Sequence, residues 1–68
     1  MTAIKRVLKE KGVSIHELHK RVRGNRTNVY EIAKGFSRAT APRQERIARA
    51  LGVRIREIFD ENGMARKA

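Results

Sequence analysis

The sequence predicts an all-α fold, a compact bundle of about five short helices. Apolar residues recur at helical spacing, for example Ile4, Val7 and Leu8 at positions i, i+3 and i+4. Residues that favour helix starts precede these runs, and glycines follow them. The chain has 68 residues and no cysteine. One small domain is therefore expected, stabilised by helix packing without disulfides.

The first two helices are predicted from the residues at their ends. Thr2 can cap a first helix, and Gly12 ends it. Ser14 and Glu17 have the spacing of a capping box, in which the Ser14 hydroxyl accepts from the Glu17 backbone N–H and the carboxylate reaches back. A second helix is therefore expected to begin at about Ile15.

A tight turn is predicted after this second helix. Its periodicity breaks at Arg23, and Gly24 can adopt a positive φ at little cost. Asn25 suits the N-cap of a third helix, and Gly35 suits its end. The third helix leaves a polar face that consists of Arg26, Thr27, Tyr30, Glu31 and Lys34. Residues 13–36 are therefore predicted to form a central helix-turn-helix.

Two further helices complete the predicted bundle. Thr40 can cap a fourth helix, Pro42 is tolerated in its first turn, and Gly52 closes it. Arg54 is a poor cap, so the pattern does not fix the start of a short fifth helix. One core is expected, made of Ile4, Leu8, Leu18, Val22, Val29, Ile32, Ile47, Leu51, Val53 and Ile58.

Composition bounds the domain organisation and the class of partner. Residues 1–61 are expected to form the domain, and residues 62–68 a flexible basic tail with too few apolar side chains to hold it. Seventeen Lys and Arg against seven Asp and Glu give a net charge of +10, which favours nucleic acid or an anionic membrane surface. No apolar run approaches the length of a membrane span, so we expect a cytoplasmic protein with no membrane partner.

The chain resembles a known family without gaps from about Ile4 to Phe59. The matching residues are Ser14, Glu17, Leu18, Arg26, Val29, Ile32, Gly35 and the run Ala48-x-Ala50-Leu51-Gly52-Val53. They resemble the phage-repressor or Cro type of DNA-binding domain, also called the xenobiotic-response-element type, with a lambda-repressor-like fold. The chain departs from the family pattern at Ile15 for a glutamine, at His19 for a small alanine, and at Arg23-Gly24, where glycine normally comes first.

The resemblance implies that double-stranded DNA is the partner and that the third helix enters its major groove N-terminus first. The residues expected to read bases are Asn25, Arg26, Thr27, Tyr30 and Glu31. Among these, Arg26 can donate two hydrogen bonds to guanine O6 and N7. Glu31 would repel phosphate, so it is expected to meet a cytosine amino group or to pair with Lys34 or Arg26. The residues expected to bind phosphates are Ser14, Asn28, Lys34, Arg38, Arg43 and Arg46.

Metal, cofactor and catalytic sites are not expected. His16 and His19 lie three residues apart on one helix, but two ligands do not make a zinc site, so surface or packing roles are favoured. No serine has an evident base and orienting partner, and the acids are scattered among basic residues. We therefore predict a protein that is not an enzyme and has no cofactor.

Two functions of different classes fit these observations. The first is a sequence-specific DNA-binding transcriptional regulator, a repressor, that occupies an operator as a weak homodimer, formed mainly on DNA, over half-sites about 10–10.5 bp apart. The second is an antitoxin-like or adaptor protein that holds a protein partner through its C-terminal helix while it is anchored to DNA. A basic adaptor for RNA or membrane phosphate is a weaker third. The residues expected at the dimer interface are Ile55, Ile58, Phe59 and Met64.

Overall fold

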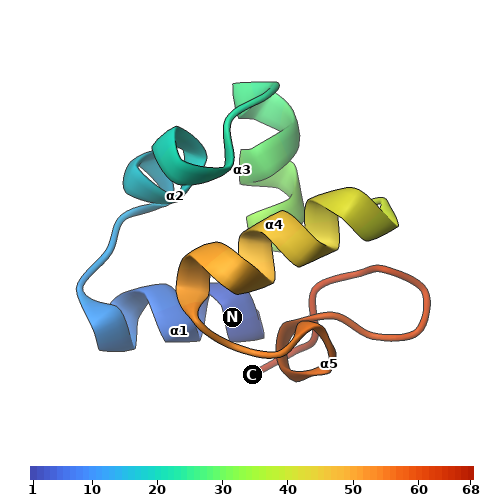
Figure 1. The fold of residues 1–68 in the computed structure, drawn as a ribbon. Helices are drawn as coiled ribbons and strands as arrows, with labels where there is room; N and C mark the ends of the chain where they lie inside the picture. Colours follow the sequence, from blue (N-terminus) through green and yellow to red (C-terminus); the bar gives the residue numbers. More distant parts are fainter.

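The computed structural model describes residues 1–68 and confirms the all-α bundle (Figure 1). Its helices are α1 (Ala3–Lys11), α2 (Ile15–Val22), α3 (Arg26–Lys34), α4 (Ala41–Leu51) and α5 (Ile55–Ile58). The α4 helix packs against both α2 and α5, and α1 packs against α3 and α5. This arrangement leaves one side of α3 without a covering helix. None of the five helices is both long and apolar enough to cross a bilayer.

A single hydrophobic core joins all five helices. Nine of the ten predicted core residues are buried, and Val53 is half-buried at the core's edge. Phe59 also belongs to this core, with 1% of its surface exposed. Burying a large apolar side chain contributes about 1.5–3 kcal/mol, so this cluster supplies the main driving force for folding. The remaining buried hydrophobic residues are Ala3, Val7, Ala33, Ala39 and Ala48.

The predicted caps of the first three helices are present. Thr2 Oγ1 accepts from the Lys5 N–H at 3.2 Å. Its hydroxyl also donates to the Ala33 carbonyl at 2.6 Å, which ties the start of α1 to the end of α3. Ser14 Oγ accepts from the Glu17 N–H at 3.1 Å, as predicted. The return bond of the capping box is not formed, because the Glu17 carboxylate lies 3.8 Å from Lys20 Nζ instead.

The start of α5 is fixed by one side chain inside the helix. An arginine side chain has no acceptor, so Arg54 cannot cap the helix as serine would. Glu57 Oε2 instead accepts from the Arg54 backbone N–H at 2.6 Å. This half of a capping box explains how a helix of four residues begins at a position that the sequence pattern left open.

Residues 62–68 are folded against the domain, which differs from the flexible tail that composition predicts. The Ala3 N–H donates to the Arg66 carbonyl at 2.7 Å, and the Arg66 N–H donates to the Ile58 carbonyl at 2.8 Å. Isolated β-bridges pair Thr2 with Lys67 and Phe59 with Ala65. Backbone hydrogen bonds therefore hold the segment, and Ala65 adds a partly buried contact with the core. The two chain ends lie close together (Figure 1).

Candidate nucleic-acid interface

The uncovered side of α3 carries a shallow depression of about 560 Å³. It brings together four of the five side chains predicted to read bases, together with Lys34. Phe36, which the sequence analysis did not single out, completes the lining and is 73% exposed. The sequence signal for Phe36 is its place directly after Gly35, the glycine that closes α3. The residues of this surface, called here the α3 face, are Arg26, Thr27, Tyr30, Glu31, Lys34 and Phe36.

Arg26 and Tyr30 form a stacked pair on the α3 face. They are four residues apart, and the Arg26 Cζ lies 5.5 Å from the centroid of the Tyr30 ring. A guanidinium over an aromatic face is attracted by about 0.5–1 kcal/mol at an exposed site. Tyr30 is half-buried, so its ring is held by the domain and favours one position of the exposed Arg26 side chain.

Asn25 is partly committed to helix formation. Its Oδ1 accepts from the Asn28 N–H at 2.9 Å, which caps the first turn of α3 as predicted. Oδ1 is therefore engaged, and the side-chain NH₂ is the group that Asn25 can offer to a base. Asn28 is half-buried, whereas Arg26 and Thr27 are exposed at the same end of the helix. The polar groups presented most openly by the start of α3 are thus those of Arg26 and Thr27.

Glu31 does not form the internal ion pair that was one of its two expected roles. Neither Lys34 nor Arg26 lies within salt-bridge distance of its carboxylate. Glu31 Oε1 has only a long contact of 3.4 Å from the Ser37 hydroxyl. The carboxylate therefore remains an available acceptor on the α3 face.

The turn between α2 and α3 contains a strained residue. Gly24 has φ +88°, as predicted, but Arg23 also has positive φ, with φ 66° and ψ −173°. This region of backbone space is essentially restricted to glycine, and occupying it costs about 1–3 kcal/mol. The strain falls at the position where the family pattern has glycine, so the departure from that pattern has a measurable structural consequence.

Two side chains from outside the turn hold it in place. His19 Nε2 lies 3.0 Å from the Gly24 carbonyl, and because a carbonyl oxygen only accepts, Nε2 carries the proton and donates. Arg43 Nη1 donates to the Arg23 carbonyl at 2.7 Å. The Arg43 guanidinium lies so close that a Cβ at residue 24 would meet it at 2.7 Å. Arg43, expected to bind phosphate, thus clamps the turn in the free protein, and His19 has a structural role.

The other residues expected to bind phosphates are spread over separate surfaces. Ser14 and Arg38 are exposed and line none of the depressions. Arg46 lies elsewhere, in a depression between the end of α2 and α4 whose other charged residues were not predicted to bind phosphate. These additional residues are Arg21, Arg23 and Arg49.

The expected dimer interface is wrong for two of its four residues. Ile58 and Phe59 are 0% and 1% exposed, so they belong to the core of the monomer and are not available to a second copy. Ile55 is 40% exposed, and Met64 is half-buried. The short α5 thus places its first isoleucine at the surface and its last in the core, a difference that the apolar pattern alone did not resolve.

Comparison with known proteins agrees with the geometry of α2 and α3. The family model described as the Cro/C1-type HTH DNA-binding domain matches residues 3–62, which include all five helices. Searches of curated proteins and of solved structures returned no match. The matched region includes the turn and the whole α3 face. The chain therefore belongs to the family of Cro/C1-type helix-turn-helix DNA-binding domains.

Proposed function

We propose that this protein is a sequence-specific transcription regulator, a repressor that blocks an operator by placing α3 in the major groove. The observation that carries the proposal is the α3 face, which is uncovered, rich in hydrogen-bonding groups and supported by the buried side of the same helix. A major groove about 12 Å wide admits one α-helix, and side chains at the N-terminus of that helix reach the base edges.

Four exposed residues of the α3 face have distinct roles in this proposal. Arg26, oriented by Tyr30, donates to O6 and N7 of a guanine, and Thr27 contacts a thymine methyl. Glu31 accepts from a cytosine amino group, because no lysine or arginine neutralises it. Lys34, at the other end of α3, binds a backbone phosphate.

Substitution of Arg26 tests the assignment of base reading. Arg26→Ala is expected to weaken binding to the preferred site by about 1–3 kcal/mol and to relax the preference at one base position. Arg6→Ala is the matched control, because Arg6 is exposed on α1 and its removal changes the net charge equally. Fluorescence anisotropy with preferred and scrambled duplexes measures both effects. Equal weakening on both duplexes would show that Arg26 contributes charge and not sequence reading.

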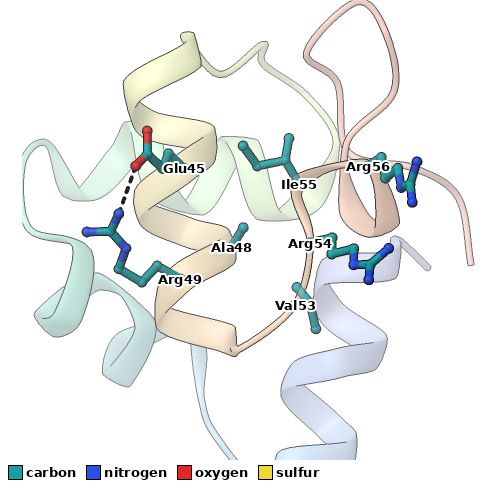
Figure 2. A pocket seen from close by; sticks show the side chains of 7 residues that line it. All are labelled: Glu45, Ala48, Arg49, Val53, Arg54, Ile55 and Arg56. Carbon is teal, nitrogen blue, oxygen red and sulfur yellow. Dashed lines mark hydrogen bonds and ion pairs between the residues drawn. The ribbon is translucent and has the colours of Figure 1, made fainter.

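The oligomeric form we propose is a weak homodimer that assembles on DNA. One recognition helix reads few base pairs, so an operator needs two copies on neighbouring half-sites. A groove of about 630 Å³ between α4 and α5 offers the partly exposed side chains of Val53 and Ile55 as apolar contacts, beside the buried Ala48. Figure 2 shows Arg54 and Arg56 beside this groove, both pointing away from α4, and Arg49 turned towards Glu45. Arg54 and Arg56 carry like charge on both copies, so they oppose the association of two free copies and keep the dimer weak.

Ile55 is expected to control cooperativity and not affinity for a single half-site. Ile55→Ser removes the exposed apolar side chain without changing the net charge, so binding to a duplex with two half-sites should no longer be cooperative. Affinity for a duplex with one half-site should stay the same, because Ile55 lies on α5, away from the α3 face. Gel-shift titrations of both duplexes separate these quantities. Unchanged cooperativity would favour the adaptor alternative, in which the groove receives another protein.

A further inference from the structure

Four arginines line a second depression, which is separate from the α3 face. It has a volume of about 440 Å³ and lies between the end of α2 and the middle of α4. All four arginines are exposed. This surface, called here the arginine groove, is lined by Arg21, Val22, Arg23, Arg46, Arg49 and Ala50.

The positive charge of the arginine groove is not balanced within the protein. Arg49 is paired with Glu45 at 2.8 Å, and no carboxylate lies within salt-bridge distance of the other three arginines. Arg21 makes only a long contact, at 3.4 Å, with the Ala50 carbonyl. Like charges gathered at one site repel each other unless an anion lies between them, and the planar guanidinium matches the geometry of a phosphate.

Arg23 provides an independent observation. It adopts φ 66° and ψ −173°, a conformation that glycine occupies without strain. The chain nevertheless has an arginine there, and its side chain lines the arginine groove. Strain at a residue whose side chain enters a charged depression points to a binding role for that side chain.

The position of Arg23 identifies which phosphate is within reach. Arg23 is two residues before Asn25, the cap of α3, so their Cα atoms are at most about 7.6 Å apart. We propose that the arginine groove binds a phosphodiester of the DNA backbone that borders the major groove occupied by α3. This proposal rests on the proposed function, because α3 must lie in the groove for that backbone to be close.

Substitution of Arg23 should move stability and binding in opposite directions. Arg23→Gly relieves the backbone strain, so the melting temperature should rise, while the affinity for duplex DNA should fall. Arg6→Gln removes the same charge from an exposed position on α1 and should lower the affinity less, so the fall beyond that of Arg6→Gln measures phosphate binding by Arg23. A variant that is more stable and binds DNA as tightly as the natural protein would exclude phosphate binding by Arg23.

The salt dependence of binding tests the whole arginine groove. Arg21→Gln combined with Arg46→Gln should lower the slope of log K against log salt by about 0.9 for each phosphate that the variant no longer neutralises. The control pair Arg6→Gln with Lys9→Gln removes the same charge from exposed positions on α1 that line no depression. An equal change in slope for both pairs would overturn the proposal, because the arginines would then contribute only to the overall field.

Combining the slope measurement with selection from a random duplex library distinguishes failure of the phosphate site from failure of the proposed function. If the slope difference is found but a random duplex library yields no preferred sequence, the phosphate site stands and sequence reading fails. If a preferred sequence is found without a slope difference, sequence reading stands and the phosphate site fails. Inorganic phosphate, exchanged for chloride at equal ionic strength, should raise the melting temperatures of the natural protein and of the Arg21→Gln, Arg46→Gln variant equally, because phosphate stabilises folded proteins without a binding site. A larger rise for the natural protein, without a slope difference on DNA, would assign the groove to free phosphate instead.

Discussion

Replacing Phe59 with alanine is expected to destabilise the protein by about 3–5 kcal/mol. Phe59 is 1% exposed and is among the largest fully buried side chains, so its removal leaves a cavity in the only core. Small domains are marginally stable, with about 5–15 kcal/mol in total, and this decrease is a large part of that. Urea denaturation followed by circular dichroism measures the change in the free energy of unfolding.

The matched control for Phe59 is Ile55→Ala. Ile55 is 40% exposed and packs against the edge of the core, so its truncation should destabilise the monomer by only about 1 kcal/mol. The destabilisation at Phe59 should be independent of protein concentration, because its packing partners lie within one chain. A small effect for Phe59→Ala, or one that disappears as the protein is concentrated, would mean that Phe59 lies in a dimer interface.

Gly63→Ala is expected to produce the second large effect, and it reports on residues 62–68. Gly63 is buried with φ +80°, and a Cβ there would meet the Ala39 carbonyl oxygen at 2.8 Å and Gln44 Nε2 at 3.0 Å. The carbonyl belongs to backbone, and Gln44 Nε2 already donates to it at 2.8 Å. The added methyl group should therefore cost about 1–3 kcal/mol for the crowding, besides the strain of positive φ.

Gly12→Ala separates these two contributions. Gly12 has φ +67°, and a Cβ there would meet nothing within 4 Å, so this variant shows the strain of positive φ alone. Thermal melts of both variants should place Gly63→Ala clearly below Gly12→Ala. Equal melting temperatures would mean that the C-terminal segment is not packed against Ala39 and is flexible, as composition predicts.

Local signals in the sequence determine most helix ends. Thr2, Ser14 and Asn25 each cap a helix by accepting a hydrogen bond from the backbone N–H three residues ahead. Residue type and spacing are therefore enough to predict these caps. The same holds for Gly12 and Gly35, whose positive φ ends a helix. Five of the six residues of the α3 face followed from these ends, because the start of a helix fixes which of its side chains share a side. Phe36 did not, because it lies beyond the end of α3.

Interactions between distant residues were not predictable in this way. The segment 62–68 is held by backbone bonds to Ala3 and Ile58, and backbone groups leave no trace in composition. The Arg43 side chain on α4 contacts the backbone of Arg23, which lies twenty residues earlier in the chain. Nothing in the sequence indicates this contact, so the sequence predicts that Arg43 is free to bind phosphate. The positive φ of Arg23 was missed because Gly24 alone was sufficient to explain the turn.

We propose that Arg26 on α3 reads a guanine in the major groove. The most direct measurement combines selection of preferred duplexes with replacement of each selected guanine by a deaza analogue that lacks N7. One such replacement should weaken binding of the natural protein and leave the Arg26→Ala variant unaffected, since that variant has no guanidinium to donate to N7. Selection that enriches no sequence, or a guanine whose N7 matters equally to both proteins, would contradict the claim.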